Sequence, residues 1–185
     1  MKIPAKKILL LSLSSFAAFF LLLVTSCNRD QCKTVVCAYN GVCNGGACIC
    51  QSGYEGSNCE TITRNKYLGD WSVFEKGSTS NAAQYFVSIV ATDNVSQVAI
   101  VNFNNYFTVP ILANVTGDTL VIFNQHADGK IVFGTGYIYS NANVTYQQYD
   151  AISLSYEVVD TATLRVDDYG YYSSLDLSNP SAWNK

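Results

Sequence analysis

The apolar and polar positions of this chain form three successive patterns. Residues 8–24 are an almost unbroken apolar run that follows Lys2, Lys6 and Lys7. Residues 30–60 contain few aliphatic side chains and many turn-forming residues. From residue 61 onward, apolar and polar positions alternate with a period close to two, which is typical of β-strands. The patterns divide the chain into segments 1–26, 27–60 and 61–185.

The alternating segment predicts an antiparallel β-domain. No amphipathic stretch of helical length separates the apolar runs, so parallel β-α-β units are not expected. Short turn signals such as Asn104-Asn105 separate the runs instead. A meander of this length closes into an up-and-down barrel or folds as a β-sandwich, and both remain open at this point. Eight strands are predicted, over residues 67–75, 84–91, 97–103, 106–114, 119–124, 130–140, 144–158 and 162–169.

If the meander closes, alternate residues of each strand line its interior. An eight-stranded barrel is either filled by side chains or holds one small ligand. Gly134 and Gly136 suit a bend or a close strand contact on the face opposite to the lining. On the same strand, the residues expected to point inward are Ile131, Phe133, Thr135, Tyr137 and Tyr139.

All seven cysteines lie in the first third of the chain. Cys27 ends the apolar run, and six others follow with the spacing C-x4-C-x5-C-x4-C-x-C-x8-C. So short and polar a segment cannot bury a core of its own, which predicts that disulfides hold it folded. A zinc site is the less favoured interpretation, because there is no pair of C-x2-C hooks and no nearby histidine. Six cysteines allow many pairings, and spacing alone does not choose among them.

The end of this segment carries a recognisable pattern. Cys48-Ile49-Cys50, followed by Gly53-Tyr54, Gly56 and Cys59, resembles the C-terminal signature of EGF-like modules. The resemblance implies the pairs Cys32 with Cys43, Cys37 with Cys48, and Cys50 with Cys59. Some members bind calcium just before the first cysteine, and Asn28, Asp30 and Gln31 resemble half of that signature. The loop 44–47 lacks the accompanying aromatic residue and few oxygen ligands are available, so no metal is assigned.

The residues around the first cysteine predict how the chain is located. Leu23-Val24-Thr25-Ser26-Cys27 resembles the lipobox of bacterial lipoproteins. It implies that residues 1–26 are a signal peptide and that Cys27 becomes an acylated N-terminus held on a lipid bilayer. The implied location is the outer membrane or cell surface of a diderm bacterium, on the periplasmic or extracellular face. An uncleaved membrane helix and a secreted eukaryotic protein with a free Cys27 are the alternatives.

The first strand of the alternating segment carries a second resemblance. Tyr67-Leu68-Gly69-Asp70-Trp71 resembles the G-x-W element of lipocalin-like (calycin) proteins. It implies an eight-stranded up-and-down barrel whose closed end is plugged by Trp71. In that family a cationic residue from the last strand packs across the tryptophan, and Arg165 is the matching residue. The threonine-aspartate-tyrosine element of larger lipocalins is not evident, and a core Trp71 in a β-sandwich is the alternative.

Charge and side-chain chemistry limit the function. Loss of residues 1–26 removes three lysines and takes the formal net charge from −3 to about −6, which argues against nucleic-acid binding. His126 is the single histidine, and a loop position without a nucleophile motif is expected for it. Asp167 and Asp168 are adjacent and point to opposite faces of a strand, so they form no carboxylate pair. Neither an enzyme nor a cofactor is therefore expected.

The remaining functions are binding functions. The first expectation is a membrane-anchored barrel that takes a small hydrophobic or aromatic ligand, with contact residues that the sequence does not identify. The alternative is a filled barrel that contacts another protein or a glycan, while the EGF-like module holds it away from the membrane.

Overall fold

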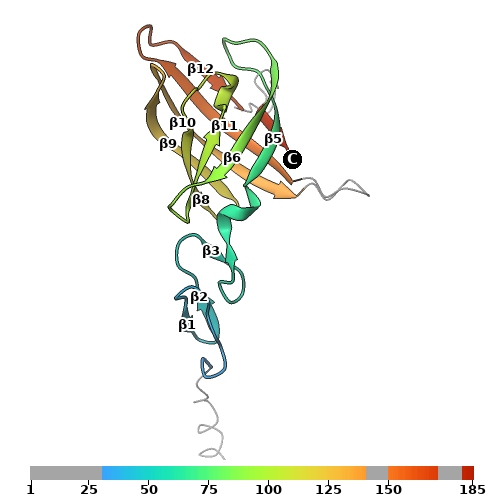
Figure 1. The fold of residues 1–185 in the computed structure, drawn as a ribbon, viewed down its shortest axis with the longest axis vertical. Helices are drawn as coiled ribbons and strands as arrows, with labels where there is room; N and C mark the ends of the chain where they lie inside the picture. The colour runs from blue at the N-terminus through green and yellow to red at the C-terminus, as the bar shows by residue number, and fades with distance from the viewer. Residues whose placement is uncertain (1–30, 141–149, 171–180) are drawn as a thin grey trace, which may run out of the picture.

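The computed structural model describes residues 31–140, 150–170 and 181–185, which form two successive all-β modules (Figure 1). An EGF-like module comes first, a short 3-10 helix η1 (Thr63–Lys66) follows it, and a barrel completes the chain. Within these residues, no helix is long and apolar enough to cross a membrane. Cys27 and the predicted signal segment lie outside the described residues.

The EGF-like module consists of short strands held by cystine bonds. Strand β1 (Val42–Asn44) pairs with β2 (Ala47–Ile49), and β3 (Tyr54–Glu55) pairs with β4 (Thr61–Ile62). Three of its aliphatic side chains, Val36, Val42 and Ile49, are exposed, whereas Cys59 is fully buried. Cystine therefore takes the place that an apolar core takes in a larger domain.

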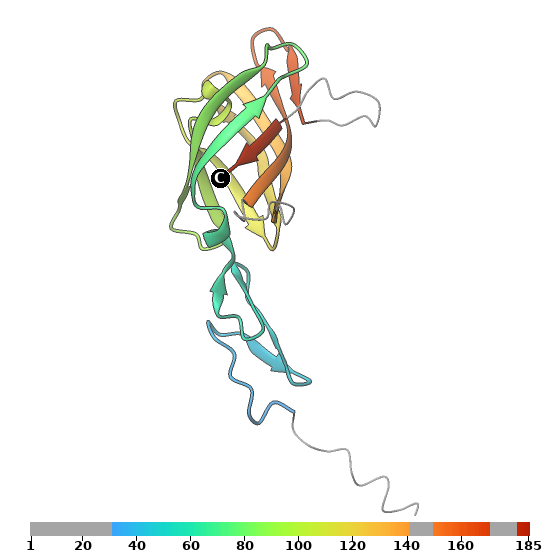
Figure 2. The same cartoon turned by 90° about the vertical axis from the view of Figure 1, so that its right-hand side faces the viewer.

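The barrel is a closed ring of eight antiparallel strands (Figure 2). Strands β5 to β10 pair in chain order, β10 pairs with β11, β11 with β13, and β13 with β5. The prediction of an eight-stranded antiparallel barrel is confirmed, and the β-sandwich alternative is not what forms. The bounds of its strands are β5 (Gly69–Glu75), β6 (Ala83–Ala91), β7 (Gln97–Val101), β8 (Ile111–Thr116), β9 (Thr119–Ala127), β10 (Lys130–Ser140), β11 (Asp150–Asp160) and β13 (Ser181–Asn184).

The strand that completes the ring is not the predicted one. The expected last strand, residues 162–169, is present only as β12 (Val166–Tyr169), which pairs with the second half of β11. The first half of β11 pairs with β13, and β13 also pairs with β5. Two short strands therefore share one edge of β11, and the unpredicted one closes the barrel.

The connection between β7 and β8 also differs from the predicted hairpin. Strand β7 ends at Val101, and β8 begins only at Ile111. Between them lies the 3-10 helix η2 (Phe103–Asn105), in which Asn104 has a left-handed backbone (φ 54°), a conformation that asparagine adopts more readily than most residues. The buried rings of Phe103 and Phe107 anchor this connection in the barrel core.

On β10 the inward face is the opposite of the predicted one. Tyr137 and Tyr139 are 58% and 50% exposed, whereas Val132 and Ile138 are buried. Gly134 lies on the inward face, where a Cβ would stand 2.4 Å from the Cβ of its cross-strand partner on β11. The glycine leaves room for an aromatic ring, Tyr156, inside the barrel. The prediction was wrong because glycine contributes no apolar signal to the pattern.

The two ends of the barrel carry different loops. We call the end with the β6–β7 and β8–β9 turns the base, and the end with the β5–β6, β9–β10 and β11–β12 turns the mouth. The side chains between them fill the barrel with aromatic and aliphatic groups. The largest of them are less than 2% exposed: Trp71, Trp183, Tyr67, Tyr156, Phe103, Ile89, Ile100, Ile111, Leu120, Ile122, Ile152 and Leu154.

The EGF-like module is fastened to the base of the barrel (Figures 1 and 2). Arg64 of η1 donates hydrogen bonds from Nη1 to the carbonyl oxygens of Thr92 and Asn94, at 2.5 and 2.8 Å, in the β6–β7 turn. Lys66 Nζ bridges Glu55 of the module, at 3.1 Å, and Asp118 of the β8–β9 turn, at 2.7 Å. These contacts place the mouth at the end far from the module.

Candidate functional site

A pocket of about 430 Å³ opens at the mouth of the barrel. Its volume lies in the range of small-molecule sites. The β5–β6 loop, the η2 connection, the start of β10 and the β11–β12 hairpin all contribute to its wall. We call it the mouth pocket, and its lining residues are Thr79, Ser80, Asn104, Tyr106, Lys130, Val158, Asp160, Thr163, Arg165, Val166, Asp167 and Tyr169.

One side of the mouth pocket is built around Asp160, at the end of β11. Its Oδ2 accepts a hydrogen bond from Lys130 Nζ at 2.9 Å. Its Oδ1 accepts from the backbone N–H of Ala162 at 3.0 Å, and from the N–H and hydroxyl of Thr163 at 2.8 and 2.9 Å. The hydrogen bond from Lys130, together with those from Thr163, lowers the pKa of Asp160 below its usual value. Lys130 Nζ also lies 4.9 Å from the centroid of the Tyr106 ring, which fixes that ring at the rim.

The other side of the mouth pocket is built around Asp167 on β12. Its Oδ1 accepts hydrogen bonds from the backbone N–H of Thr79 at 2.7 Å and from the Ser78 hydroxyl at 3.3 Å. Its Oδ2 accepts from the Tyr169 hydroxyl at 2.9 Å. Since that hydroxyl has a single proton, the Ser80 hydroxyl is the donor in the 2.7 Å contact between Ser80 and Tyr169. These hydrogen bonds join β12 to the β5–β6 loop, with which it forms no strand pairing.

A buried carboxyl group lies at the mouth end of β5. Glu75 is 2% exposed, and its Oε1 accepts hydrogen bonds from Tyr85, from Tyr156 at 2.7 Å and from Asn104 Nδ2 at 3.1 Å. Its Oε2 accepts from the Ser181 hydroxyl at 3.2 Å. We call these five residues the Glu75 cluster. It joins β5, β6, η2, β11 and β13, and therefore ties the η2 connection to the strand that closes the ring.

The Glu75 cluster contains no cation among its five members. Burial raises the pKa of Glu75 above its usual value, although its four hydrogen bonds oppose that shift. Burial, followed by the charge of Glu75, raises the pKa values of Tyr85 and Tyr156, so both phenols stay protonated and act as donors. The cluster reaches the mouth pocket through Asn104 and through the ring of Tyr169, which stacks on Tyr156 at 4.5 Å between centroids.

The base of the barrel carries the G-x-W element. Trp71 is fully buried, and its Nε1 donates a hydrogen bond to the carbonyl oxygen of Tyr67 at 2.8 Å. Gly69 begins β5 with φ 120°, a backbone conformation that favours glycine. The cation over the Trp71 ring is Lys185, at 5.2 Å from the centroid. Arg165 lines the mouth pocket instead, so the prediction that it packs across Trp71 was wrong. Strand β13, which ends beside Lys185, closes the barrel in place of the predicted 162–169 strand.

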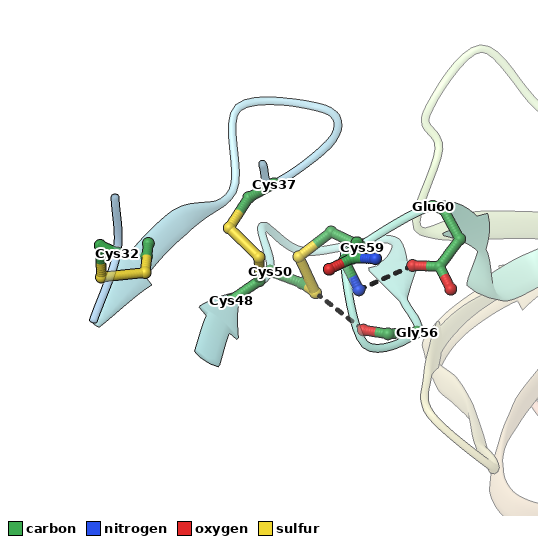
Figure 3. The surroundings of a disulfide bond; sticks show 9 residues. Cys32, Cys37, Cys48, Cys50, Gly56, Cys59 and Glu60 are labelled. Carbon is green, nitrogen blue, oxygen red and sulfur yellow. Dashed lines mark hydrogen bonds between the residues drawn. A yellow bond between two sulfur atoms is a disulfide. The ribbon is translucent and has the colours of Figure 1, made fainter. Parts of the chain in front are cut away.

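The three cystines of the EGF-like module lie one after another along it (Figure 3). They join Cys32 to Cys43, Cys37 to Cys48 and Cys50 to Cys59, with Cα–Cα distances of 5.8, 5.7 and 5.2 Å. These are the pairs that the EGF resemblance implies. Residues 34–61 match the family model of the teneurin-like EGF domain. The EGF-like module is thus supported by its sequence and by its cystine pattern.

The chain has a distant match among solved structures. It is a crystal structure of a protein of unknown function from Bacteroides ovatus, with 12% sequence identity and a TM-score of 0.41. The match covers 64% of this chain and 41% of the other one. The chain therefore spans about two fifths of the length of that protein.

The remaining predicted residues take structural positions. His126 is exposed on β9, one residue before the strand ends, rather than in a loop. Asp168 Oδ2 lies 3.3 Å from the Ser78 hydroxyl, whose single proton it shares with Asp167, and its backbone N–H donates to that hydroxyl at 3.0 Å, so it also helps hold the β5–β6 loop. Asn28 and Asp30 of the calcium half-signature lie outside the described residues. In the part of the chain that the structure describes, no group of three or more His, Cys, Asp or Glu side chains is placed to hold a metal ion.

The sequence reasoning missed the Glu75 cluster and most of the mouth pocket. A signal for Glu75 was present, because alternation along β5 puts it on the same face as Trp71 and Val73. An acidic residue at an inward position of a barrel strand predicts a buried carboxyl that needs donors. Its partners come from distant parts of the chain, and no local pattern marks them.

Proposed function

We propose that this chain is a non-enzymatic binding lipoprotein on the surface of a diderm bacterium. In this proposal acylated Cys27 anchors the chain, the EGF-like module acts as a stalk, and the filled barrel presents the mouth pocket to a glycan. The supporting observation is that the residues lining the pocket belong to the mouth. The mouth is the end of the barrel opposite the EGF-like module (Figure 2).

The packing of the barrel favours a rim site over an interior one. Trp183, Phe103 and Tyr156 occupy the interior at 1% exposure or less. A hydrophobic ligand inside the barrel would have to displace them, at a cost of several lost core contacts. The packing therefore gives the first expectation, an interior hydrophobic ligand, no support, and it favours the alternative of a filled barrel with an external partner.

The chemistry of the mouth pocket suits a sugar. Its wall combines the aromatic rings of Tyr106 and Tyr169 with the hydroxyl groups of Thr79 and Thr163 and the amide of Asn104. Aromatic rings accept the C–H faces of a sugar, while hydroxyl and amide groups bond its edges. A volume of about 430 Å³ accommodates a short oligosaccharide rather than a protein segment of standard interface size.

A glycan array with matched variants tests this function. Val166 lines the mouth pocket and is 39% exposed, whereas Val101 is 40% exposed on β7 outside the pocket. We expect Val166→Trp to fill the pocket and weaken glycan binding at least about tenfold, and Val101→Trp to leave binding unchanged. A wild-type protein that binds no glycan, or equal binding by both variants, would overturn the proposal.

The anchor is tested separately. Intact mass spectrometry of membrane-extracted protein should show a chain that begins at Cys27 and carries the mass of two or three acyl chains. We expect Cys27→Ser to leave the membrane fraction. An unmodified mass from native membranes would contradict the lipoprotein assignment without affecting the pocket.

A further inference from the structure

The acceptor groups of the mouth pocket are already occupied by the protein. A carboxylate has about four lone-pair positions. Asp160 accepts four hydrogen bonds, from Lys130, Ala162 and the two donors of Thr163. Asp167 accepts three, two of them at Oδ1. Neither carboxylate has much capacity left for a ligand hydroxyl.

Two cationic groups of the same pocket have unused donors, whereas the hydroxyl groups of Thr163 and Tyr169 and the amide N–H groups of Asn104 already donate within the protein. In the part of the chain that the structure describes, the guanidinium of Arg165 makes no hydrogen bond or ion pair, and all five of its N–H donors are available. Lys130 Nζ has three donors and gives one of them to Asp160. The pocket thus contains a surplus of cationic donors, although its two cations and two aspartates balance in formal charge.

A donor surplus selects for a ligand with a surplus of acceptors. A neutral sugar hydroxyl both donates and accepts, whereas a carboxylate, sulfate or phosphate group only accepts. A guanidinium binds such groups through two parallel hydrogen bonds. Resting on the glycan-binding function proposed above, we infer that the mouth pocket recognises an acidic sugar, whose anionic group is bound by Arg165 and Lys130.

The net charge of the chain restricts the binding of an anion to the mouth pocket. The mature chain is acidic, with a net charge of about −6 once residues 1–26 are removed, so its general surface repels an anion. The two cations of the pocket provide the counter-charge at one place. Val158 and Val166 add an apolar part to the wall, against which the ring of the sugar packs.

The experiment compares acidic sugars with their neutral counterparts. The probes are oligogalacturonides and their methyl esters, and sulfated or phosphorylated oligosaccharides with the unmodified parents. Binding to the full acylated protein in detergent is measured for the wild type, Arg165→Gln and Lys76→Gln. Lys76 is an exposed cation of the β5–β6 loop that does not line the pocket, so its variant controls for the loss of one positive charge.

We expect the acidic member of at least one pair to bind about tenfold or more tightly than its neutral counterpart. Arg165→Gln should remove most of that preference, and Lys76→Gln should preserve it. The pair that shows the effect identifies carboxylate, sulfate or phosphate as the bound group. Binding of the acidic member should also weaken with added salt, because the pocket is open to solvent.

Two results separate the failure of this inference from that of the glycan function. In the first, Val166→Trp abolishes glycan binding, but acidic sugars bind no more tightly than neutral ones, or Arg165→Gln leaves the preference unchanged. This result overturns the inference alone. Binding that Val166→Trp leaves unchanged overturns the glycan function, and the inference with it. Since the Arg165 guanidinium holds no other described residue in place, the variant should keep the wild-type urea midpoint, which confirms that it folds.

Discussion

The substitution Trp183→Ala tests the part of the fold that closes the barrel. Trp183 lies on β13, and its neighbours across the sheet are Val73 on β5 and Ile152 on β11. Its ring is 1% exposed and lies 5.9 Å from the ring of Phe103, between centroids. Its Nε1 donates a hydrogen bond to the Ser181 hydroxyl at 3.3 Å. The side chain therefore joins both edges of the closing strand to the η2 connection.

The expected loss of stability is large for one residue. A buried tryptophan removes about 150–250 Å² from water, which at about 25 cal/mol per Å² is worth about 4–6 kcal/mol. Measured tryptophan-to-alanine changes in cores cost about 3–5 kcal/mol, because the cavity partly relaxes. We expect a decrease of about 4 kcal/mol in the free energy of unfolding. With a urea m-value of about 2 kcal/mol/M, the unfolding midpoint falls by about 2 M.

The assay is urea unfolding of the chain from residue 27 with Cys27→Ser. The chain has two tryptophans, so the variant retains the buried Trp71 as a fluorescence reporter, and circular dichroism supplies a second probe. Phe86→Ala is the matched control, since Phe86 is an aromatic residue that is 68% exposed on β6. If Trp183→Ala lowers the stability by less than about 1 kcal/mol, or no more than the control does, β13 does not close the barrel as described.

Three further predictions follow from other parts of the structure. Because burial raises the folded-state pKa of Glu75 above its unfolded value of about 4.3, its contribution to stability is greatest at low pH and is lost as the pH rises through the folded pKa. The stability difference between wild type and Glu75→Gln, from urea unfolding across that range, should change in this direction, and a constant difference would contradict it. Gly134→Ala would place a Cβ 2.4 Å from that of Tyr156 and should lower the stability by about 1–3 kcal/mol in the same assay, while Thr135→Ala on the outward face costs less. Arg64→Met leaves the β6–β7 carbonyls without their donor and should speed amide exchange in residues 92–97 but not within β10.

The sequence predicted those features that rest on local pattern. The bounds of β10 match the predicted 130–140 strand, because turn residues flank a long alternating run on both sides. The cystine pairs followed from a resemblance carried by closely spaced residues. In contrast, β13 is four residues long and has no alternating run of its own, so only its pairing with β5 and β11 defines it as a strand.

The candidate site depends on contacts between distant residues, which explains why little of it was predicted. Arg165 was singled out as a cation near the last strand, but Lys185 occupies the position over Trp71. Glu75 and Ser181 meet across more than a hundred residues of sequence. Asn104 looks like an ordinary turn residue until the η2 connection brings its amide to Glu75. The local sequence around each of these residues therefore does not predict their contacts with one another.

The fastening of the EGF-like module to the base would limit which ligands the proposed binding site can reach. Arg64 and Lys66 clamp the stalk to the turns at the base, and the mouth pocket opens at the other end. A chain anchored through Cys27, five positions before Cys32, would then point its pocket away from its own bilayer. Glycans carried by a facing cell or a free polymer would be accessible in trans, whereas headgroups of the same membrane would be out of reach. Bending at the junction between the module and the barrel would be needed to reach those headgroups, so in the proposed function Arg64 and Lys66 would set the direction of binding as well as the docking of the module.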